Sequence, residues 1–220
     1  MTQRDLYFIS GSPPCWTIML ALEIKGIAYN QRRLDNSKGE QKGAAFLGIN
    51  PRGNVPVLVD GTATVCETLA ILAYLDAIAP APPLFGTIPQ ETARIWQTIC
   101  DCDSHVRGPV GDISRPLFRG KVQAFTQQIT EAAAIVREEL GSLEARLASS
   151  PWLVGKALSA ADLVVFPVLM QLCRAVGRED TAPLDLAIHP LGEYFPALNE
   201  WRLRMENLDG FDNAYPPHWK

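Results

Sequence analysis

The sequence predicts an α/β domain followed by an all-helical domain. Strand and helix patterns alternate over residues 1–79, which is typical of an α/β unit. The proline-rich stretch at 80–83 then interrupts the chain, and no strand pattern returns beyond it. We therefore expect a first domain at 1–79, a linker at 80–88 and an all-helical domain at 89–220.

The first domain has the order of elements found in a thioredoxin-like fold. Short apolar runs predict strands, Gly26 ends a helix after the first of them, and Asp60-Gly61 is a typical hairpin turn. An almost wholly apolar segment then predicts a buried helix. The expected elements are strands at 6–9, 27–34, 55–59 and 62–65, the helix ending at Gly26, a helical turn near 44–47, and the apolar helix at 67–79.

The second domain is predicted to contain only helices. Helical spacing runs through 89–106 and 121–147, and the latter is rich in strong helix formers. Ser159 and Asp162 have the spacing of a capping box, with Asp in place of the usual Glu or Gln, before an apolar helix at 163–170. We expect this capped helix to form the core of the domain.

Composition argues against several classes of function. The chain has 220 residues, a net charge of −4 and 47% hydrophobic residues, with no basic stripe, so a nucleic-acid partner is not expected. No apolar run approaches the ~18 residues that a membrane span needs, and the first residues do not resemble a secretion signal. We expect a cytoplasmic protein without a membrane partner.

The five cysteines predict neither a disulfide framework nor a metal site. They are odd in number and widely scattered along the chain, which favours reduced thiols. Cys100 and Cys102 are two residues apart, so on a helix they point to different sides, and no third ligand of matching spacing is near. We expect no metal.

The run Ser12-Pro13-Pro14-Cys15 lies between an apolar strand and a helix, like a redox C-x-x-C motif whose first cysteine is replaced. At that position free N–H groups and the helix dipole stabilise a thiolate. Serine keeps an anion-stabilising geometry but cannot form a disulfide, so the stabilised thiolate should belong to a ligand. This pattern points toward glutathione.

Several motifs together resemble a cytosolic glutathione S-transferase of a serine-type class, most like the rho class. The resemblance covers nearly the whole chain. It rests on Ser12-Pro13-Pro14-Cys15-Trp16, Asn50-Pro51-Arg52-Gly53-Asn54-Val55-Pro56, Glu67-Thr68, the box at 159–162 and the closing Tyr215-Pro216-Pro217-His218-Trp219.

The resemblance implies an enzyme that conjugates the glutathione thiolate to small hydrophobic electrophiles, with glutathione as co-substrate. It also implies a homodimer. Ser12 would donate its hydroxyl to the glutathione sulfur. Val55-Pro56 would be a cis dipeptide whose valine backbone pairs with the cysteinyl part of the ligand. The binding residues implied are Gln41, Lys42 and Asn54 for the glycyl carboxylate, Val55 and Pro56, and Glu67 and Thr68 for the γ-glutamyl end.

Other interpretations remain open for the same residues. Ser12 and the Glu67-Thr68 pair could act only as helix caps, and Lys42 could be a solvated charge. Cys15 is either a buried, inert thiol or the redox group of a thiol transferase. A glutathione-dependent isomerase and a non-catalytic ligand-binding protein are further alternatives.

The residues of an apolar co-substrate pocket are harder to assign. Trp16, Trp219 and the residues around His105 and Arg107 could line it beside the sulfur. Core packing is the other interpretation of each aromatic ring. In addition, Thr68 replaces the serine found in the family, and it retains the hydroxyl.

Overall fold

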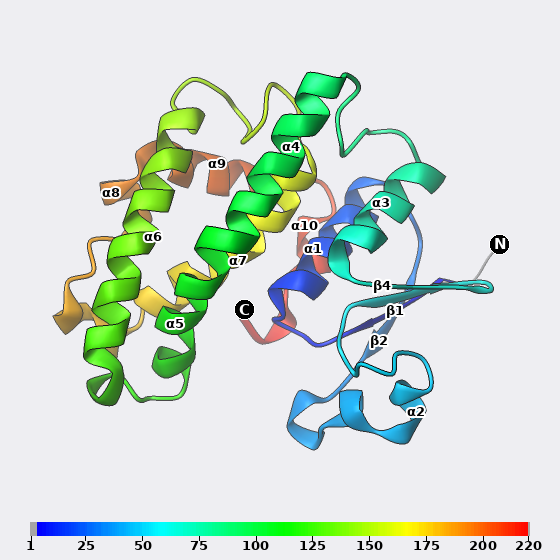
Figure 1. The fold of residues 1–220 in the computed structure, drawn as a ribbon, viewed down its shortest axis with the longest axis horizontal. Helices are drawn as coiled ribbons and strands as arrows, with labels where there is room; N and C mark the ends of the chain where they lie inside the picture. Colours follow the sequence, from blue (N-terminus) through cyan, green and yellow to red (C-terminus); the bar gives the residue numbers. More distant parts are fainter. Residues whose placement is uncertain (1–3, 220) are drawn as a thin grey trace. The chain divides into compact units, whose positions relative to one another are not determined.

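The computed structural model describes residues 4–219, and their contacts divide the chain into two compact units (Figure 1). The first unit contains the residues up to Leu84 together with those from Leu208 onward. The second unit runs from Phe85 to Asn207. Each has its own core and is described by itself.

A four-stranded mixed sheet forms the centre of the first unit. It consists of β1 (Arg4–Phe8), β2 (Asn30–Arg33), β3 (Val57–Asp60) and β4 (Ala63–Cys66) in the order β2-β1-β3-β4. Strand β1 is parallel to β2 and antiparallel to β3, and β4 is antiparallel to β3. This arrangement confirms the thioredoxin-like topology, although β2 and β3 are shorter than the sequence patterns suggest.

Helices cover the sheet of this unit. They are α1 (Pro13–Ile24), α2 (Ala44–Leu47), α3 (Thr68–Ile78) and, near the end of the chain, α10 (Phe211–Ala214). Side chains of β1 alternate between the two faces of the sheet. Leu6 and Phe8 are therefore buried on one face, whereas the ring of Tyr7 meets that of Phe46 in α2 on the other, with centroids 5.7 Å apart.

Helix α3 is less buried than its composition predicts. Only Ile71, Leu72 and Leu75 are buried, and Ile78 at the end of the helix is 41% exposed. One face of α3 packs against α1, and a helix that contacts its unit along one face leaves its other apolar side chains outside the core. The expectation of a buried helix therefore holds for one face of α3 and not for the other.

The C-terminal segment packs on the first unit, whereas the sequence-based division had placed it in the helical domain. The ring of Trp16 in α1 is fully buried, and its centroid lies 5.9 Å from that of Phe211, 5.7 Å from Tyr215 and 5.2 Å from Trp219. Burial of large aromatic rings dominates core energetics, so this cluster anchors the end of the chain to α1.

The second unit contains only helical elements among its described residues. They are α4 (Pro89–Asp101), a π-helical turn (Cys102–Val106), α5 (Arg107–Phe118), α6 (Thr126–Leu147), α7 (Ala160–Val176), α8 (Leu191–Tyr194) and α9 (Pro196–Glu206). The sequence did not predict α5, whose glycines and prolines have low helix propensity. Burial of Val110, Ile113 and Leu117 against α6 and α7 outweighs that preference.

The capped helix α7 is the core of this unit, as predicted. The carboxylate of Asp162 is fully buried and accepts four hydrogen bonds. They come from the amide and hydroxyl of Ser159, the amide of Leu153 and the indole N–H of Trp201, at 2.9–3.0 Å. Burial raises the pKa of this carboxyl, and the four donors oppose that rise. One carboxylate thereby joins three segments of the unit.

Replacing this carboxylate should strongly destabilise the protein. In Asp162→Asn one oxygen becomes an amide group that faces donors, so buried N–H groups lose their acceptor. We expect a loss of roughly 3 kcal/mol in the free energy of unfolding, measured by urea denaturation. Glu200→Gln, at an exposed position of α9, is the control and should change the free energy of unfolding by less than about 0.5 kcal/mol. Equal stability of the two variants would contradict the role of Asp162.

The turn before α1 is held by the C-terminal segment. Gly11 has a φ of +80°, and a β-carbon added there would lie 3.0 Å from Nε2 of His218 and 3.1 Å from the ring of Trp219. Ser10 Oγ and His218 Nδ1 are hydrogen-bonded at 3.1 Å. The backbone conformation and the close contact both require glycine at this position.

Gly11→Ala should therefore destabilise the first unit, by about 1–2 kcal/mol or more, because it combines a left-handed conformation with crowding of the C-terminal segment. Gly141→Ala in α6 is the matched control, since a β-carbon there meets no atom within 4 Å. It should stabilise the protein by roughly 0.5–1 kcal/mol through helix propensity. Thermal and urea unfolding of both variants test the contrast, and a neutral Gly11→Ala would show that the turn tolerates a side chain.

Candidate functional site

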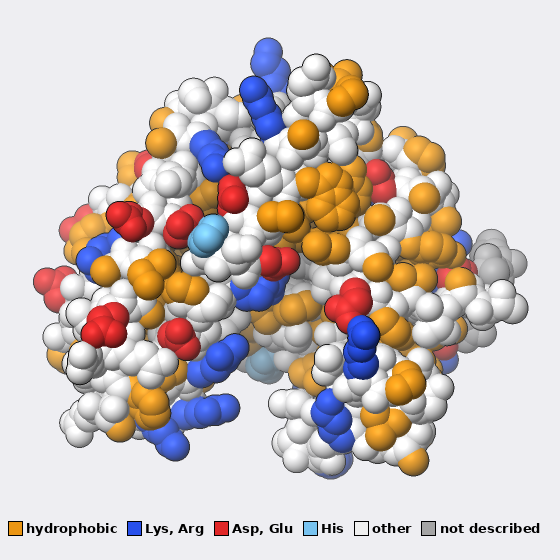
Figure 2. All heavy atoms as spheres, in the orientation of Figure 1, with side chains coloured by type: hydrophobic (Ala, Val, Ile, Leu, Met, Phe, Trp, Pro, Cys, Tyr) orange, Lys and Arg blue, Asp and Glu red, His pale blue; other side chains and the backbone are white. Residues whose placement is uncertain are grey.

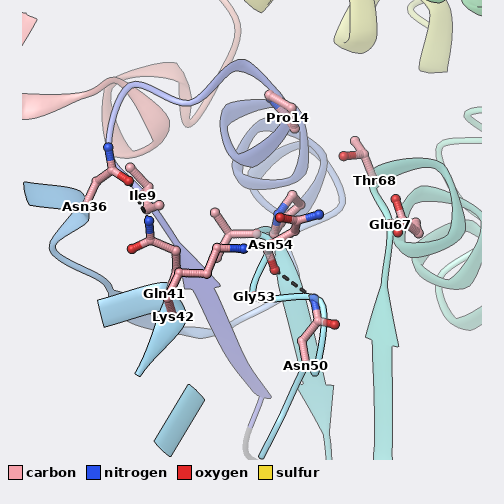
Figure 3. A pocket seen from close by; sticks show the side chains of 12 residues that line it. Ile9, Pro14, Asn36, Gln41, Lys42, Asn50, Gly53, Asn54, Glu67 and Thr68 are labelled. Atoms are coloured by element: carbon pink, nitrogen blue, oxygen red, sulfur yellow. Dashed lines mark hydrogen bonds between the residues drawn. The ribbon is translucent and has the colours of Figure 1, made fainter. Parts of the chain in front are cut away.

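A cavity of about 390 Å³ lies in the first unit, and its polar lining comes from segments that are well separated in sequence (Figure 3). All seven residues that the sequence assigns to ligand binding line it: Gln41, Lys42, Asn54, Val55, Pro56, Glu67 and Thr68. Ile9, Pro14, Asn36, Asn50 and Gly53 complete the lining. The fold thus brings the predicted binding residues together in one place.

Ser12 is not one of the lining residues of this cavity, although it is close in sequence to two of them. It is half-buried and lies between Ile9 and Pro14, which do line the cavity. Ser12 is the N-cap residue of α1, yet its side chain makes no capping hydrogen bond. The structure therefore does not support an interpretation in which the hydroxyl serves only as a helix cap.

The start of α1 offers few backbone donors. Pro13 and Pro14 occupy its first two positions and have no N–H, and the Trp16 amide donates to the Ser12 carbonyl. Among the first three positions of the helix, only Cys15 carries a backbone N–H. The Ser12 hydroxyl is a side-chain donor at the N-terminal end of α1, where it lies within hydrogen-bonding reach of the Cys15 thiol. This end carries the positive pole of the helix dipole.

A tight loop at residues 50–54, just before β3, forms one part of the cavity lining. Asn50 is buried, and its amide group donates to the Asn54 carbonyl while its Oδ1 accepts from the Arg52 amide, at 2.8 and 3.2 Å. The following Val55-Pro56 peptide bond is cis, as predicted. A β-carbon on Gly53 would lie 2.6 Å from the Gln41 carbonyl oxygen, so only glycine fits there.

One side of the cavity carries amides and a cation from the segment before α2. Gln41 Nε2 donates to Asn36 Oδ1 at 2.8 Å, whereas Gln41 Oε1 is buried and has no hydrogen-bond partner among the described residues. Lys42 Nζ donates to the Arg52 carbonyl at 2.9 Å. Lys42 is therefore exposed to solvent and lines the cavity, with its ammonium group anchored to the neighbouring loop. Figure 3 shows these side chains on the side opposite α3.

Glu67 and Thr68 lie at the start of α3, on the other side of the cavity (Figure 3). Glu67 is the N-cap residue with a φ of 70°, an uncommon conformation for a residue other than glycine, and its side chain makes no capping hydrogen bond. Instead, its Oε1 lies 3.2 Å from Nη1 of Arg52. The carboxylate therefore serves an ion pair at the cavity rather than the helix end.

Cys15 and Trp16 lie inside the first unit. The Cys15 thiol is 1% exposed, and burial raises its pKa to about 11. It borders a second cavity of about 230 Å³ that the C-terminal segment covers. These surroundings favour a protonated, unreactive thiol. Trp16 belongs to the aromatic core described above, which favours the packing interpretation of this ring over a substrate-lining one.

The binding residues expected from the sequence do not include five lining residues, Ile9, Pro14, Asn36, Asn50 and Gly53, or Arg52, which pairs with Glu67. Asn50, Arg52 and Gly53 lie within the Asn-Pro-Arg-Gly stretch that was singled out, and an asparagine before a proline is a known turn former. Asn36 lies in a polar segment without periodicity. No local signal could have indicated its hydrogen bond to Gln41.

The described residues contain neither a candidate metal site nor a helix suited to crossing a membrane. Among residues 4–219, no three His, Cys, Asp or Glu side chains gather where they could hold a metal ion. Within the same residues, no helix combines the length and apolar character that crossing a membrane requires.

Comparisons with known proteins place the chain in a family. Residues 11–78 match the glutathione S-transferase N-terminal domain and residues 126–204 match the C-terminal domain. Glutathione S-transferase D6 of Drosophila melanogaster is 30% identical over 199 residues, which is 90% of this chain and 84% of the fly protein. A probable maleylacetoacetate isomerase of Vibrio cholerae is 27% identical over 232 residues, covering 98% and 97% of the two chains.

The crystal structure of a glutathione S-transferase from the Antarctic clam Laternula elliptica has a similar fold. Its TM-score is 0.84 at 27% sequence identity, and the match covers 99% of this chain and 94% of the clam chain. The domain matches together span most of the sequence, and the fly relative is aligned over most of its own length. The chain therefore belongs to the glutathione S-transferase family.

Proposed function

We propose that this protein is a serine-type glutathione transferase, which conjugates the thiolate of glutathione to small hydrophobic electrophiles. One observation carries the proposal: the seven residues assigned to glutathione binding line a single cavity, together with Ile9 and Pro14 on either side of Ser12 in the chain. Membership of the family supports it. The rho-class character rests on the sequence motifs.

Ser12 would lower the pKa of the glutathione thiol. A thiol of pKa ~8.5 is only about 3% ionised at pH 7, and a decrease of about two units, roughly 2.7 kcal/mol, makes most of it thiolate. The prolines at the start of α1 remove two backbone donors, so the hydroxyl of Ser12 and the helix dipole would have to provide this stabilisation. Ser12 is the residue to which we assign the catalytic role.

The charges of the cavity fit the ends of glutathione. Lys42, with Gln41 and Asn54 beside it, would hold the glycyl carboxylate. Glu67 would bind the α-ammonium of the γ-glutamyl end, and the Thr68 hydroxyl its carboxylate. The backbone of Val55 would pair with the cysteinyl part of the ligand, as in strand addition.

In the reaction, the sulfur of the bound thiolate would form a bond to the electrophilic carbon, and either a leaving group departs with its electron pair or the product takes up a proton. We assign glutathione binding to the domain at 1–79 and the apolar electrophile to the domain at 89–220. We also propose a homodimer in the cytoplasm, because these properties are general for the family.

A glutathione-dependent isomerisation is the second candidate. Its support is the relative described as a probable maleylacetoacetate isomerase, which aligns with almost the entire chain. Such a reaction uses the same thiolate, which adds to the substrate and leaves again. A thiol transferase is less well supported, because the Cys15 thiol is buried and its pKa is about 11.

Ser12→Ala is the direct test of the proposal. The variant should raise the pKa of the bound glutathione thiol by about one unit or more and reduce conjugation of an activated aryl halide by at least about tenfold. Thiolate absorbance against pH and initial rates measure the two effects. Ser142→Ala, on the exposed side of α6, is the control. An unchanged thiol pKa in Ser12→Ala would remove Ser12 from its role.

Cys15→Ala separates conjugation from thiol transfer. With a pKa of about 11, only about 0.1% of this thiol is ionised at pH 8. We expect the variant to keep conjugation activity within about twofold, provided that circular dichroism shows a folded protein. Cys173→Ala, at a half-buried residue whose thiol also has a pKa of about 11, controls for the loss of a cysteine side chain. A folded, inactive Cys15→Ala beside an active Ser12→Ala would favour a thiol transferase.

A further inference from the structure

Arg52 connects the two charged sides of the cavity, although it is not among the residues assigned above to glutathione. Its carbonyl accepts the hydrogen bond from Lys42 Nζ, and its guanidinium pairs with Glu67 at 3.2 Å. In the space-filling view, acidic and basic side chains adjoin on the surface between the start of α3 and α2 (Figure 2). Arg52, which does not itself line the cavity, therefore contacts one lining residue on each side, Lys42 and Glu67.

The backbone of Arg52 is held by hydrogen bonds within its loop, whereas its side chain is exposed and paired only with Glu67 among the described residues. Asn50 holds the loop through its contacts to Arg52 and Asn54, and the Gly53 amide donates to the Asn50 carbonyl at 2.9 Å. In contrast, the side chains of Arg52 and Glu67 are 74% and 66% exposed. A guanidinium on a rigid loop can accept a new partner at little cost in backbone order.

The α-carboxylate of the proposed ligand would gain from a cationic partner. The γ-glutamyl end of glutathione carries an ammonium and a carboxylate on the same carbon. Glu67 can neutralise only the ammonium, and Thr68 offers the carboxylate a neutral hydroxyl. Arg52, whose guanidinium already lies 3.2 Å from Glu67, is placed beside that pair of charges. Its planar set of donors matches a carboxylate.

We propose that Arg52 binds the α-carboxylate of the γ-glutamyl group while Glu67 binds its α-ammonium, so that the ion pair recognises an amino-acid zwitterion. This inference rests on the proposed function, since it takes glutathione as the ligand. It makes Arg52 a specificity-determining residue. The class of thiol selected is one with a free α-amino acid linked through its side chain, and thiols that lack the α-carboxylate are disfavoured.

A different explanation is that Arg52 only orients Glu67, or forms an ordinary surface ion pair of little energetic value. The chain contains a suitable comparison. Arg32 of β2 pairs with Asp5 at the same 3.2 Å, and neither residue lines the cavity. Arg32→Gln therefore controls for the loss of an arginine from an ion pair of equal length in the same unit.

The experiment measures binding by calorimetry on the full chain, for the wild type, Arg52→Gln and Arg32→Gln. Three probes without a free thiol are used, so the result does not depend on Ser12: S-methylglutathione, its deaminated analogue with a glutaryl group, and its decarboxylated analogue with a γ-aminobutyryl group. We expect Arg52→Gln to weaken binding of the first two about fivefold or more, and of the third by less than about twofold. Arg32→Gln should leave all three within about twofold.

The deaminated analogue decides between the two roles of Arg52. Without an ammonium there is nothing for Glu67 to bind, so an arginine that only orients Glu67 would have no effect on this probe. Unchanged affinity of Arg52→Gln for the deaminated analogue, or an equal loss for the decarboxylated one, would overturn the inference. If the wild type fails to bind S-methylglutathione, the proposed function itself is refuted. Wild-type binding that Arg52→Gln leaves unchanged refutes only the role of Arg52.

Discussion

The position of α1 is the constraint on which the site depends. Its residues from Cys15 to Leu22 are all buried, and the Trp16 ring is held by three aromatic rings of the C-terminal segment. Such an immobilised helix fixes the residue that precedes it, so Ser12 is held between Ile9 and Pro14, which line the cavity. The adjoining prolines then decide which donors are available there, because they carry no N–H groups.

The polar side chains that line the cavity form hydrogen bonds and ion pairs with one another or with the adjoining loop. Asn50 orders the loop of Arg52, Arg52 anchors Lys42 through its carbonyl, and the same residue pairs with Glu67. Fixed donors and charges of this kind lower the entropy that ligand binding must overcome. The arrangement suits an extended, multiply charged ligand better than a compact one.

Burial explains why similar residue types have different roles in the two units. Asp162 lies in the core, satisfied by four donors, and holds segments together, whereas Glu67 is largely exposed and carries its charge at the cavity. Likewise, Cys15 keeps its proton because burial raises its pKa, whereas Ser12 three residues earlier is half-buried and makes no capping hydrogen bond. Residue type alone would not distinguish these roles.

The sequence by itself determined the topology of the sheet, the capped helix α7, the cis bond at Val55-Pro56 and seven of the residues that line the cavity. These follow from local periodicity, turn chemistry and motifs, or from resemblance to a family. Only the tertiary structure decided the pairing of Arg52 with Glu67, the burial of Cys15, the partial exposure of α3 and the packing of the C-terminal segment on α1. Such features depend on contacts between residues far apart in the chain, and local patterns carry no information about which distant side chains meet.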